Sequence, residues 1–572
     1  MREFYLRSAN LVDVENRAIR KADIRVVNGR FASITEAGGR MPAGVNIIDC
    51  RGRFVAPGLI DGHTHTELSL LSAAPFAEML IRSGTTAAII DPHDFVNVVG
   101  MRGLGLLIRE AKGAPLRGFF MAPCCVPSTS GFEDGGIKVS VDDVLDALER
   151  REVIGLAEVM DTARLLRKEK GIMSMIDAAK KRGLVIDGHC PSLSPRDESR
   201  YFALSGAKTD HESTDATEIM RKHGKGRWIH LRRTSLGKEY PYSGIFRETG
   251  AERLMLATDG CVSPVDVMEN GHISAFVRDI IRGGVAPAVA LSVATINPAR
   301  CYGLDKEIGS IAPGKRADFV IAPAMRGFRP EKTFINGRDM DGVRFERLGF
   351  PAYALRTIKA RTPRTDGLAV RVPKGLKGAK TVRVNVIGIK KRTLLTKKQK
   401  TVMKNSDGVI HPDPSRDVLK AVVLERHSGI GRPQAAFVTG FGLKAGAFGG
   451  SIGQDCQHIC VIGCTDGDII GVIDAVIKAQ GGIFYVKCGV VKAGLRLPIG
   501  GIMTDAPPAE VAGKLKGIEK ALRRNGVKDA VPYLTLSLRI TLAAIPELKL
   551  TDRGLLDVRA GRFVNVAERG AA

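Results

Sequence analysis

Long apolar runs are missing from this sequence. No window approaches the roughly 18 consecutive uncharged apolar residues that a membrane-spanning helix needs. The N-terminal stretch MREFYLRSANLVDVENRAIR also lacks the apolar core of a signal peptide. We therefore expect a cytoplasmic globular protein with no membrane partner.

Closely spaced cysteines are also scarce. Among ten cysteines, only the pair Cys124 and Cys125 and the trio Cys456, Cys460 and Cys464 lie near one another. This scatter does not resemble a disulfide framework, so we expect reduced thiols. QHICVIG is typical of a strand, which predicts that the trio is buried among apolar neighbours rather than binding zinc with His458.

Acidic residues are outnumbered, with 61 Asp and Glu against 86 Lys and Arg and a formal net charge of +25. Such an excess can indicate a nucleic-acid partner. Much of it lies in residues 390–406, KKRTLLTKKQKTVMKNS, where no aromatic residue is interleaved to stack on bases. We expect a solvent-facing basic surface here and no nucleic-acid partner.

Eight short apolar runs alternate with amphipathic stretches between residues 55 and 300. The runs are residues 59–65, 85–91, 117–123, 153–160, 183–190, 207–213, 227–233 and 253–260. Stretches such as VDDVLDALERR and IMSMIDAAKKRG lie between them and have helical periodicity. Eight strand-helix units in about 250 residues predict a (β/α)8 barrel.

Potential metal ligands lie at the ends of these runs, where a barrel carries its chemistry. His63 and His65 are two residues apart on a strand, so both imidazoles project to the same side. Other runs end in a carboxylate or a third or fourth histidine: Glu158, His189, His211 and Asp259. Together these side chains predict a metal centre at the barrel mouth.

The chain resembles the adenine deaminase family of the amidohydrolase superfamily along nearly its whole length. The N-terminal motifs are PGLIDGHTHTELS, GTTAAIIDPHDFVNVVG, GLAEVM, DGHCPSLS, DHEST, ATINPARCYGL and IGSIAPGKRADFVI. The C-terminal motifs GFGLKAGAFGGSIG, LPIGGIMTD and IPELKLTDRGLLDV resemble adenine deaminases in particular. The resemblance implies an α/β protein: a (β/α)8 TIM-like metal-dependent hydrolase barrel at 57–307, a small β-sandwich-like domain at 1–56 plus 308–360, and a C-terminal α/β domain at 361–572.

The resemblance also implies hydrolytic deamination of adenine to hypoxanthine and ammonia at a binuclear site. His63 and His65 would hold one metal and His189 and His211 the other, with Glu158 bridging them. Two divalent ions sharing a water lower its pKa from 15.7 toward about 7, which yields a hydroxide nucleophile at neutral pH. Asp259 would be a further ligand and would transfer the proton to the departing nitrogen.

Imidazole and carboxylate ligands do not by themselves choose among Mn2+, Fe2+ and Zn2+. The resemblance favours manganese. We also expect a small-molecule substrate and a homo-oligomer.

Five further residues are candidates for substrate binding, and four of them have a structural alternative. Asp91 and His93 are suited either to a direct role in the site or to a structural role that supports its residues. Glu67 is suited either to a substrate contact or to loop capping. Glu212 follows a ligand and is placed to orient it. Asp455 lies in the C-terminal region, and His272 is suited equally to the site and to helix packing.

Three segments depart from the family pattern. Thr258-Asp259-Gly260 stands where Thr-Asp-Asp is usual, residues 454–458 read QDCQH in place of His-Asp-Ser-His-Asn, and residues 232–235 read RRTS in place of Arg-Glu-Gly-Ser. These changes leave open another cyclic amidine or amide as the substrate. We expect adenine, with the altered residues not touching the base.

Overall fold

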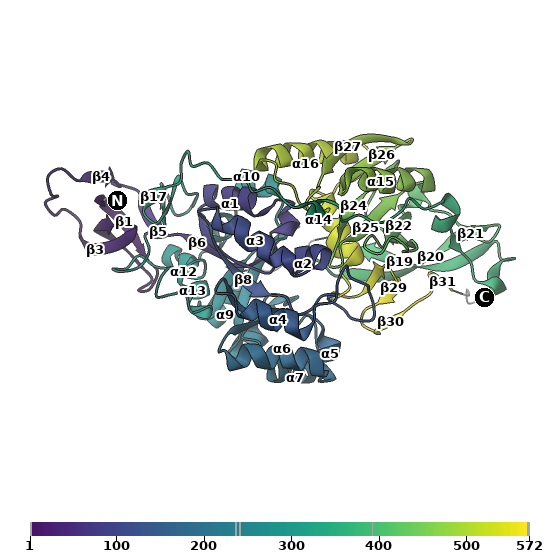
Figure 1. Ribbon diagram of the computed structural model, residues 1–572, viewed down its shortest axis with the longest axis horizontal. Helices are drawn as coiled ribbons and strands as arrows, with labels where there is room; N and C mark the ends of the chain where they lie inside the picture. The colour runs from purple at the N-terminus through teal and green to yellow at the C-terminus, as the bar shows by residue number, and fades with distance from the viewer. Residues whose placement is uncertain (1–2, 235–236, 239–241, 392, 569–572) are drawn as a thin grey trace.

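The computed structural model describes residues 3–234, 237–238, 242–391 and 393–568, so Ser235 and Arg392 lie outside the described residues. The molecule is elongated, with a small N-terminal sheet at one end, a barrel in the centre and a C-terminal domain at the other end (Figure 1). Within the described ranges, no helix is both long and apolar enough to cross a membrane.

The eight strands expected of a barrel are all present. They are β6 (Leu59–Thr64), β7 (Thr85–Ile90), β8 (Arg117–Ala122), β9 (Val153–Val159), β10 (Val185–Gly188), β11 (Thr209–Asp210), β12 (Trp228–Thr234) and β14 (Leu254–Ala257). Parallel ladders join β6 through β10, and β12 pairs with both β11 and β14. The backbone N–H of Lys208 donates to Ile186 at 2.9 Å and that of Asp259 to His63 at 2.9 Å, which closes the two remaining seams. The predicted fold class is confirmed.

Helices surround this barrel because each connecting stretch has one apolar face. They are α1 (Ala73–Arg82), α2 (His93–Val99), α3 (Arg102–Lys112), α4 (Val141–Leu148), α5 (Thr162–Leu166), α6 (Lys170–Lys181), α7 (Pro195–Ser205), α8 (Ala216–Gly224), α9 (Tyr242–Thr249), α10 (Pro264–Asn270), α11 (Ile273–Arg282), α12 (Pro287–Ser292) and α13 (Ile296–Cys301). Strands β6 and β7 are buried along their whole length, as expected when helices cover the outside of a parallel barrel and side chains fill its inside.

The small N-terminal sheet is built from two distant parts of the chain. Its strands are β1 (Glu3–Asp13), β2 (Ala18–Val27), β3 (Arg30–Glu36), β4 (Asn46–Asp49), β5 (Phe54–Pro57), β15 (Phe319–Ala322), β16 (Lys332–Ile335) and β17 (Arg338–Asp339). Asn28-Gly29 and Asn336-Gly337 form two hairpin turns, with positive φ at each residue. Phe31 on β3 lies 6.0 Å from Phe319 on β15, ring centroid to centroid, although three strands separate them in the sheet order. The sheet is therefore folded over its own core, in a sandwich-like form.

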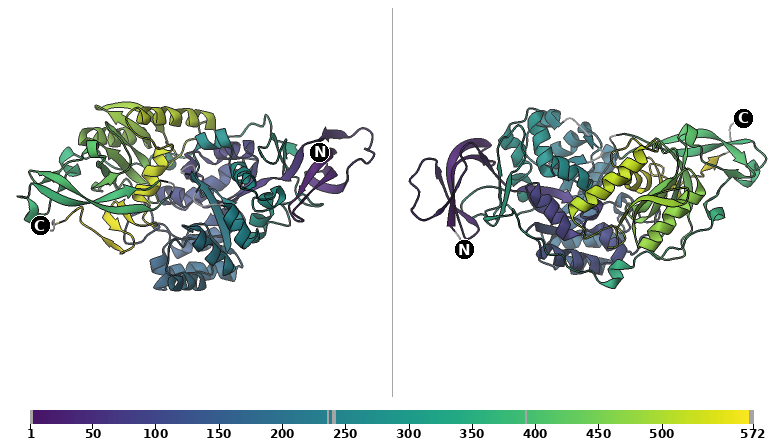
Figure 2. Two further views of the ribbon diagram at one scale, coloured as in Figure 1. Left: turned by 180° about the vertical axis from the view of Figure 1, so that it is seen from behind. Right: turned by 90° about the horizontal axis from the view of Figure 1, so that it is seen from above.

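The C-terminal domain contains an 11-stranded sheet, a three-stranded sheet and several helices. Its strands are β18 (Val370–Arg371), β19 (Thr381–Ile389), β20 (Thr396–Ser406), β21 (Val409–Ile410), β22 (Leu419–Leu424), β23 (Gln434–Thr439), β24 (Ala447–Gly453), β25 (His458–Gly463), β26 (Gly482–Lys487), β27 (Val490–Arg496), β28 (Leu548–Thr551), β29 (Gly554–Asp557), β30 (Arg562–Phe563) and β31 (Ala567–Glu568). The helices are α15 (Asp466–Ala479), α16 (Pro508–Arg523), α17 (Pro532–Leu534) and the π-helix η5 (Thr535–Thr541). Figure 2 shows the helical segment α17–η5, in yellow, beside the barrel and the C-terminal sheet.

Two sequence expectations concern this domain. Cys456, Cys460 and Cys464 are buried free thiols, as predicted. Most of the basic segment forms β20, on which Lys397, Lys398 and several other residues are exposed to solvent. The solvent-facing character expected of this segment is thus observed over β20.

Candidate metal centre

The six predicted ligands all converge at the carboxyl end of the barrel strands. His63 lies on β6 and Glu158 on β9, while the others follow within two residues of the ends of strands: His65, His189, His211 and Asp259. All six are buried, with relative exposures from 0% to 9%. A barrel brings the carboxyl ends of its strands to one face, which explains why residues nearly 200 positions apart meet here.

Glu158 stands at the centre of this group. Its Oε1 lies 3.7 Å from His63 Nε2 and 3.3 Å from His65 Nε2. Its Oε2 lies 2.6 Å from His189 Nδ1 and 3.1 Å from His211 Nε2. Each carboxylate oxygen thus faces one pair of histidines, which is the arrangement that a bridging ligand between two cations requires.

The first two imidazoles are oriented by partners on their far side. His63 Nδ1 lies 3.3 Å from the carboxylate of Asp187, and His65 Nδ1 lies 2.9 Å from the backbone carbonyl oxygen of Asp91. A proton on each Nδ1 leaves the Nε2 lone pair directed toward Glu158. Acceptors behind an imidazole commonly fix its tautomer in this way at metal sites.

The electrostatics keep the two carboxylates ionised. Burial acts to raise the pKa of Glu158, but the surrounding histidines, led by His211, hold it well below its ordinary value. Burial opposes ionisation of Asp259 as well, and the nearby Arg232 guanidinium together with His65 lowers its pKa strongly. Two ionised carboxylates at the bottom of a buried site favour the binding of cations.

Several buried ligand atoms here make no hydrogen bond within the protein. They include His63 Nε2, His189 Nε2, Asp91 Oδ2 and both ring nitrogens of His93 and His211. One atom from each of Glu158, His189 and His211 lies within 4.8 Å of the others, and the same holds for His65, Asp91, His93 and Glu158. Imidazole and carboxylate donors that make no hydrogen bond to the protein suit divalent metals, so the residues fit such ions.

Two sequence profiles match this chain: the Amidohydrolase family over residues 54–237 and 238–340, and the Adenine deaminase C-terminal domain over residues 393–562. The adenine deaminase of Archaeoglobus fulgidus is 37% identical over 565 residues, which covers 99% of this chain and 95% of that protein. This chain belongs to the adenine deaminase family. The adenine deaminase of Desulfatibacillum aliphaticivorans is 33% identical, with 99% of this chain and 97% of that protein covered. A solved Xaa-Pro dipeptidase with bound methionine aligns with 59% of this chain and 100% of its own, at 15% identity and a TM-score of 0.46.

The five candidate substrate residues lie around the predicted metal ligands of this adenine deaminase family member. His93 Nδ1 lies 3.2 Å from Asp91 Oδ2 and 3.7 Å from Glu158 Oε1. Asp455 comes from the C-terminal domain, and its Oδ1 lies 3.9 Å from His93 Nε2. Glu67 caps the first turn of α2 by accepting the N–H of Phe95 at 3.0 Å.

Glu212 is held by the Arg232 guanidinium, which also donates to Asp259 Oδ2 at 2.7 Å. Arg232 thus links a substrate candidate to the proposed proton-transfer residue. Arg232 belongs to the segment 232–235 noted in the sequence, but no role in the site was predicted for it.

The three departures from the family pattern have different positions. Gln454 lines the central cavity, where its amide donates to both oxygens of Asp94 at 2.8 Å. Gln457 donates to Asp94 Oδ1 at 2.7 Å and to Gln454 Oε1 at 2.8 Å. Both the nitrogen and the oxygen of the Gln454 amide therefore make hydrogen bonds within the protein. Only the face of this side chain remains for contact with a ligand.

Gly260 and Arg233 are not among the residues that line that cavity, although Asp259 and Cys261 on either side of Gly260 are. Gly260 has φ of +61°, and a Cβ there would meet the backbone oxygen of His65 at 2.5 Å. The aspartate usual at this position in the family would therefore strain the backbone of a metal ligand in this chain. Arg233 pairs with Asp266 at 3.4 Å and Asp279 at 3.2 Å.

A second group of buried residues supports the site, and only His272 among them was a candidate in the sequence. Asp61 accepts from the Thr258 hydroxyl at 2.6 Å and lies 3.3 Å from His272 Nε2, and Asp187 accepts from the Tyr302 hydroxyl at 2.9 Å. His272 thus supports Asp61 beneath the metal ligands. The sequence contains a signal for the two aspartates, because Ile-Asp-Gly-His occurs twice, at 60–63 and 186–189.

The C-terminal domain covers the barrel mouth with apolar side chains. The cavity at the metal ligands has a volume of about 30 Å³, and its roof is formed by Leu394, Leu538, Leu542 and Ile545. Tyr533, on α17, donates from its hydroxyl to the backbone oxygen of Leu68 at 3.5 Å. The site is therefore enclosed by both the barrel and the C-terminal domain.

Proposed function

We propose that this chain catalyses the hydrolytic deamination of adenine to hypoxanthine and ammonia. One observation carries the proposal: four of the six predicted ligands from the Amidohydrolase region line the same cavity as Gln454 and Asp455 from the adenine deaminase C-terminal region. The four are His65, Glu158, His189 and Asp259. The predicted cation-binding residues and the residues of the adenine deaminase C-terminal region would thus contact the same bound molecule.

We propose that His63 and His65 hold one divalent cation and His189 and His211 a second, with Glu158 between them and Asp259 as a further ligand. Bound divalent metal supplies a lowered pKa for water and so a nucleophile at neutral pH. We propose Mn2+ as the native ion, with Fe2+ and Zn2+ as the competing candidates. We retain the division into 1–56 plus 308–360, 57–307 and 361–572 as a proposed domain organisation, and self-association and a cytoplasmic location as proposals.

Asp259 is proposed to accept the proton of the attacking water and to deliver it to the nitrogen that leaves as ammonia. Its Oδ1 lies 3.1 Å from His65 Nε2, so the carboxylate is beside the ligand group where the water would react. Arg232 keeps it ionised and ready to accept a proton. Such proton transfer contributes about 10²- to 10⁴-fold to a rate.

Asp455 is proposed to bind a ring N–H of adenine. Its Oδ2 is buried and has no protein hydrogen-bond partner, and the residue lines the cavity. An unpartnered buried carboxylate oxygen gains a hydrogen bond when a donor enters. We propose that Glu67, Asp91, His93 and Glu212 complete the polar surroundings of the base.

Ammonia release from a panel of adenine, other purines and cyclic amides tests this function. The enzyme is supplied with Mn2+, and its bound metal is measured in the same preparation. We expect adenine to be the best substrate. A folded, metal-loaded preparation that releases no ammonia from adenine would overturn the proposal, and release from another heterocycle would identify the alternative cyclic amidine or amide.

A further inference from the structure

The cavity at the metal ligands is much smaller than a purine base. Its volume of about 30 Å³ provides room for only about one or two water molecules. Its lining residues His65, His93 and Glu158 are buried at 2%, 3% and 3% exposure. A base that reacts there must displace part of the wall, so the wall has to contain a movable part.

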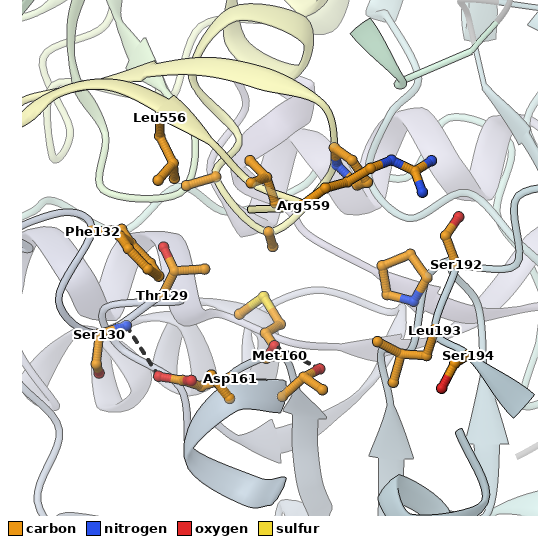
Figure 3. Close-up of a pocket in the computed structure, with 17 residues that line it drawn as sticks. Thr129, Ser130, Phe132, Met160, Asp161, Ser192, Leu193, Ser194, Leu556 and Arg559 are labelled. Atoms are coloured by element: carbon orange, nitrogen blue, oxygen red, sulfur yellow. Dashed lines mark hydrogen bonds between the residues drawn. The ribbon is translucent and has the colours of Figure 1, made fainter. Parts of the chain in front are cut away.

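A second cavity, which we call the outer chamber, adjoins this site. It has a volume of about 360 Å³, within the range of about 300–1,000 Å³ typical of small-molecule sites. Its lower side consists of the loops that follow β8, β9 and β10, including Thr129, Met160 and Ser192 (Figure 3). Its upper side is the C-terminal segment around Ala544 and Leu556.

Met160 lines both cavities. It lies two residues after Glu158 and stands on the floor of the outer chamber in Figure 3. Methionine is unbranched and has several rotatable bonds, so it changes its shape at low cost. This side chain is therefore suited to a partition that opens.

Residues 542–546 provide the other half of the partition. Leu542 and Ile545 line the metal cavity, whereas Ala543, Ala544 and Pro546 line the outer chamber. The segment follows the π-helix η5 and has no regular secondary structure. One short irregular stretch thus separates the two cavities.

The lining of the outer chamber suits a neutral planar heterocycle. Phe132 offers an aromatic ring, and Asp161 is already engaged by the backbone N–H groups of Ser130 at 3.0 Å and Arg164 at 3.1 Å. The exposed Arg559 lies at the chamber wall, where its Nε lies 3.4 Å from Glu547 Oε1 and its guanidinium plane offers a surface for stacking. The chamber therefore combines apolar and stacking surface with polar groups that are largely satisfied.

We propose that the outer chamber is the passage by which the purine base reaches the metal centre, with Met160 and residues 542–546 as the movable partition. The inference rests on the proposed function only for the identity of the base. A competing route exists at another cavity of about 520 Å³, lined by Ser263, Glu519 and Ala530, but this cavity shares no lining residue with the metal cavity.

Thiol labelling tests the passage. Cys488 is the exposed cysteine among those described, so Cys488→Ser provides the background. In it, Ala544→Cys places a thiol in the outer chamber and Ala530→Cys places a matched thiol in the competing cavity. Each variant is treated with methyl or benzyl methanethiosulfonate, labelling is verified by mass spectrometry, and the unlabelled variant is its own reference.

We expect the benzyl group at position 544 to lower kcat/KM about tenfold or more, because an obstructed entry step slows association. The methyl group should have a smaller effect, dithiothreitol should reverse both, and bound metal should stay constant. The benzyl group at position 530 should not change kcat/KM. Full benzyl labelling at 544 without loss, or loss on labelling at 530, would overturn the proposal.

A second measurement separates this inference from the proposed function. The rate at which dipicolinate removes bound metal from the labelled protein requires access to the site but no turnover. Benzyl labelling at 544 should slow that removal, and labelling at 530 should not. If adenine proved not to be the substrate, this rate would still decide the route, and equal rates for both labelled variants would contradict it.

Discussion

The carboxylate of Asp94, on the barrel, accepts two hydrogen bonds of 2.8 Å from the amide of Gln454, on the C-terminal domain. Both residues are buried, at 0% and 3% exposure. The contact joins residues 360 positions apart across the top of the metal cavity. The two domains are thus held in register by a polar contact within the site itself.

Replacing Gln454 by Leu should test this contact. The change keeps a side chain of similar size and leaves Asp94 with only Gln457 as an amide donor, so the free energy of unfolding should fall by about 1–3 kcal/mol. KM for adenine should rise as the cavity wall loosens. Gln434→Leu, at a half-buried position on β23, is the control and should change stability by less than about 0.5 kcal/mol. Equal stability of the Gln454→Leu variant and the wild-type protein in urea would show that the contact contributes nothing.

Glu158→Gln should lower metal content and activity together. The amide removes the anionic charge that faces four histidines, while its similar shape lets the chain fold. Metal per chain is measured by atomic emission, and folding by circular dichroism. Glu110→Gln changes a buried carboxylate that is bonded to Ser72 and to the start of α1 instead, so its metal content should equal that of the wild type. Unchanged metal content in Glu158→Gln would remove Glu158 from the site.

Asp259→Asn should keep most of the metal but depress kcat by about 10²- to 10⁴-fold, since an amide does not accept the proton. The remaining histidines and Glu158 still offer ligands. Asp266→Asn, a change on α10 outside the metal cavity, should leave kcat close to that of the wild type. A near-normal kcat for Asp259→Asn would refute the proton-transfer role.

Lys549 should make stability depend on pH. Its ammonium is fully buried and donates to the backbone oxygens of Leu394, Leu538 and Arg539 at 3.3, 3.0 and 3.1 Å, which holds the roof segment in place. Burial, with the nearby Arg539, lowers its pKa from 10.5 to about 7. Between pH 7 and 10.5 the unfolded chain therefore binds the extra proton, so stability rises with pH.

Lys549→Met removes this titration. The free energy of unfolding of the wild type should rise relative to that of the variant by up to about 1.4 kcal/mol per pH unit between pH 7 and 10, and the difference should level off below pH 7. Urea unfolding at pH 6, 7.5 and 9 measures it. For Lys514→Met, at a solvent-exposed position on α16, the free energy of unfolding should change with pH as it does in the wild type. If the free energy of unfolding of Lys549→Met changed with pH as it does in the wild type, the lowered pKa of Lys549 would be contradicted.

The sequence was sufficient for the barrel because short strand-like runs alternate eight times with stretches of helical periodicity. It was sufficient for the gathering of His63, His65, Glu158, His189, His211 and Asp259, because a barrel brings all carboxyl ends of its strands to one face. Neither argument needs the details of side-chain packing.

Strand periodicity and barrel geometry could not predict the contacts between the barrel and the C-terminal domain. Asp94 meets Gln454, and Leu542 covers ligands such as His65, through packing between segments that share no periodic pattern. The expectation that the altered segments do not touch the base stays a prediction: Gln454 and Asp455 line the cavity, whereas Gly260 and Arg233 are not among its lining residues. Local sequence cannot distinguish these cases, because only the fold of the second domain decides which loop reaches the barrel mouth.

The small N-terminal sheet imposes an order on synthesis. Strand β5, which ends at Pro57, pairs with β15, which begins at Phe319, about 260 residues later. At about 5–20 residues per second, a ribosome takes on the order of tens of seconds to produce the partner strand. During that interval the edge of β5 has no β15 to pair with, while the barrel between the two strands is synthesised and folds. The N-terminal sheet of the nascent chain is therefore completed only after the barrel.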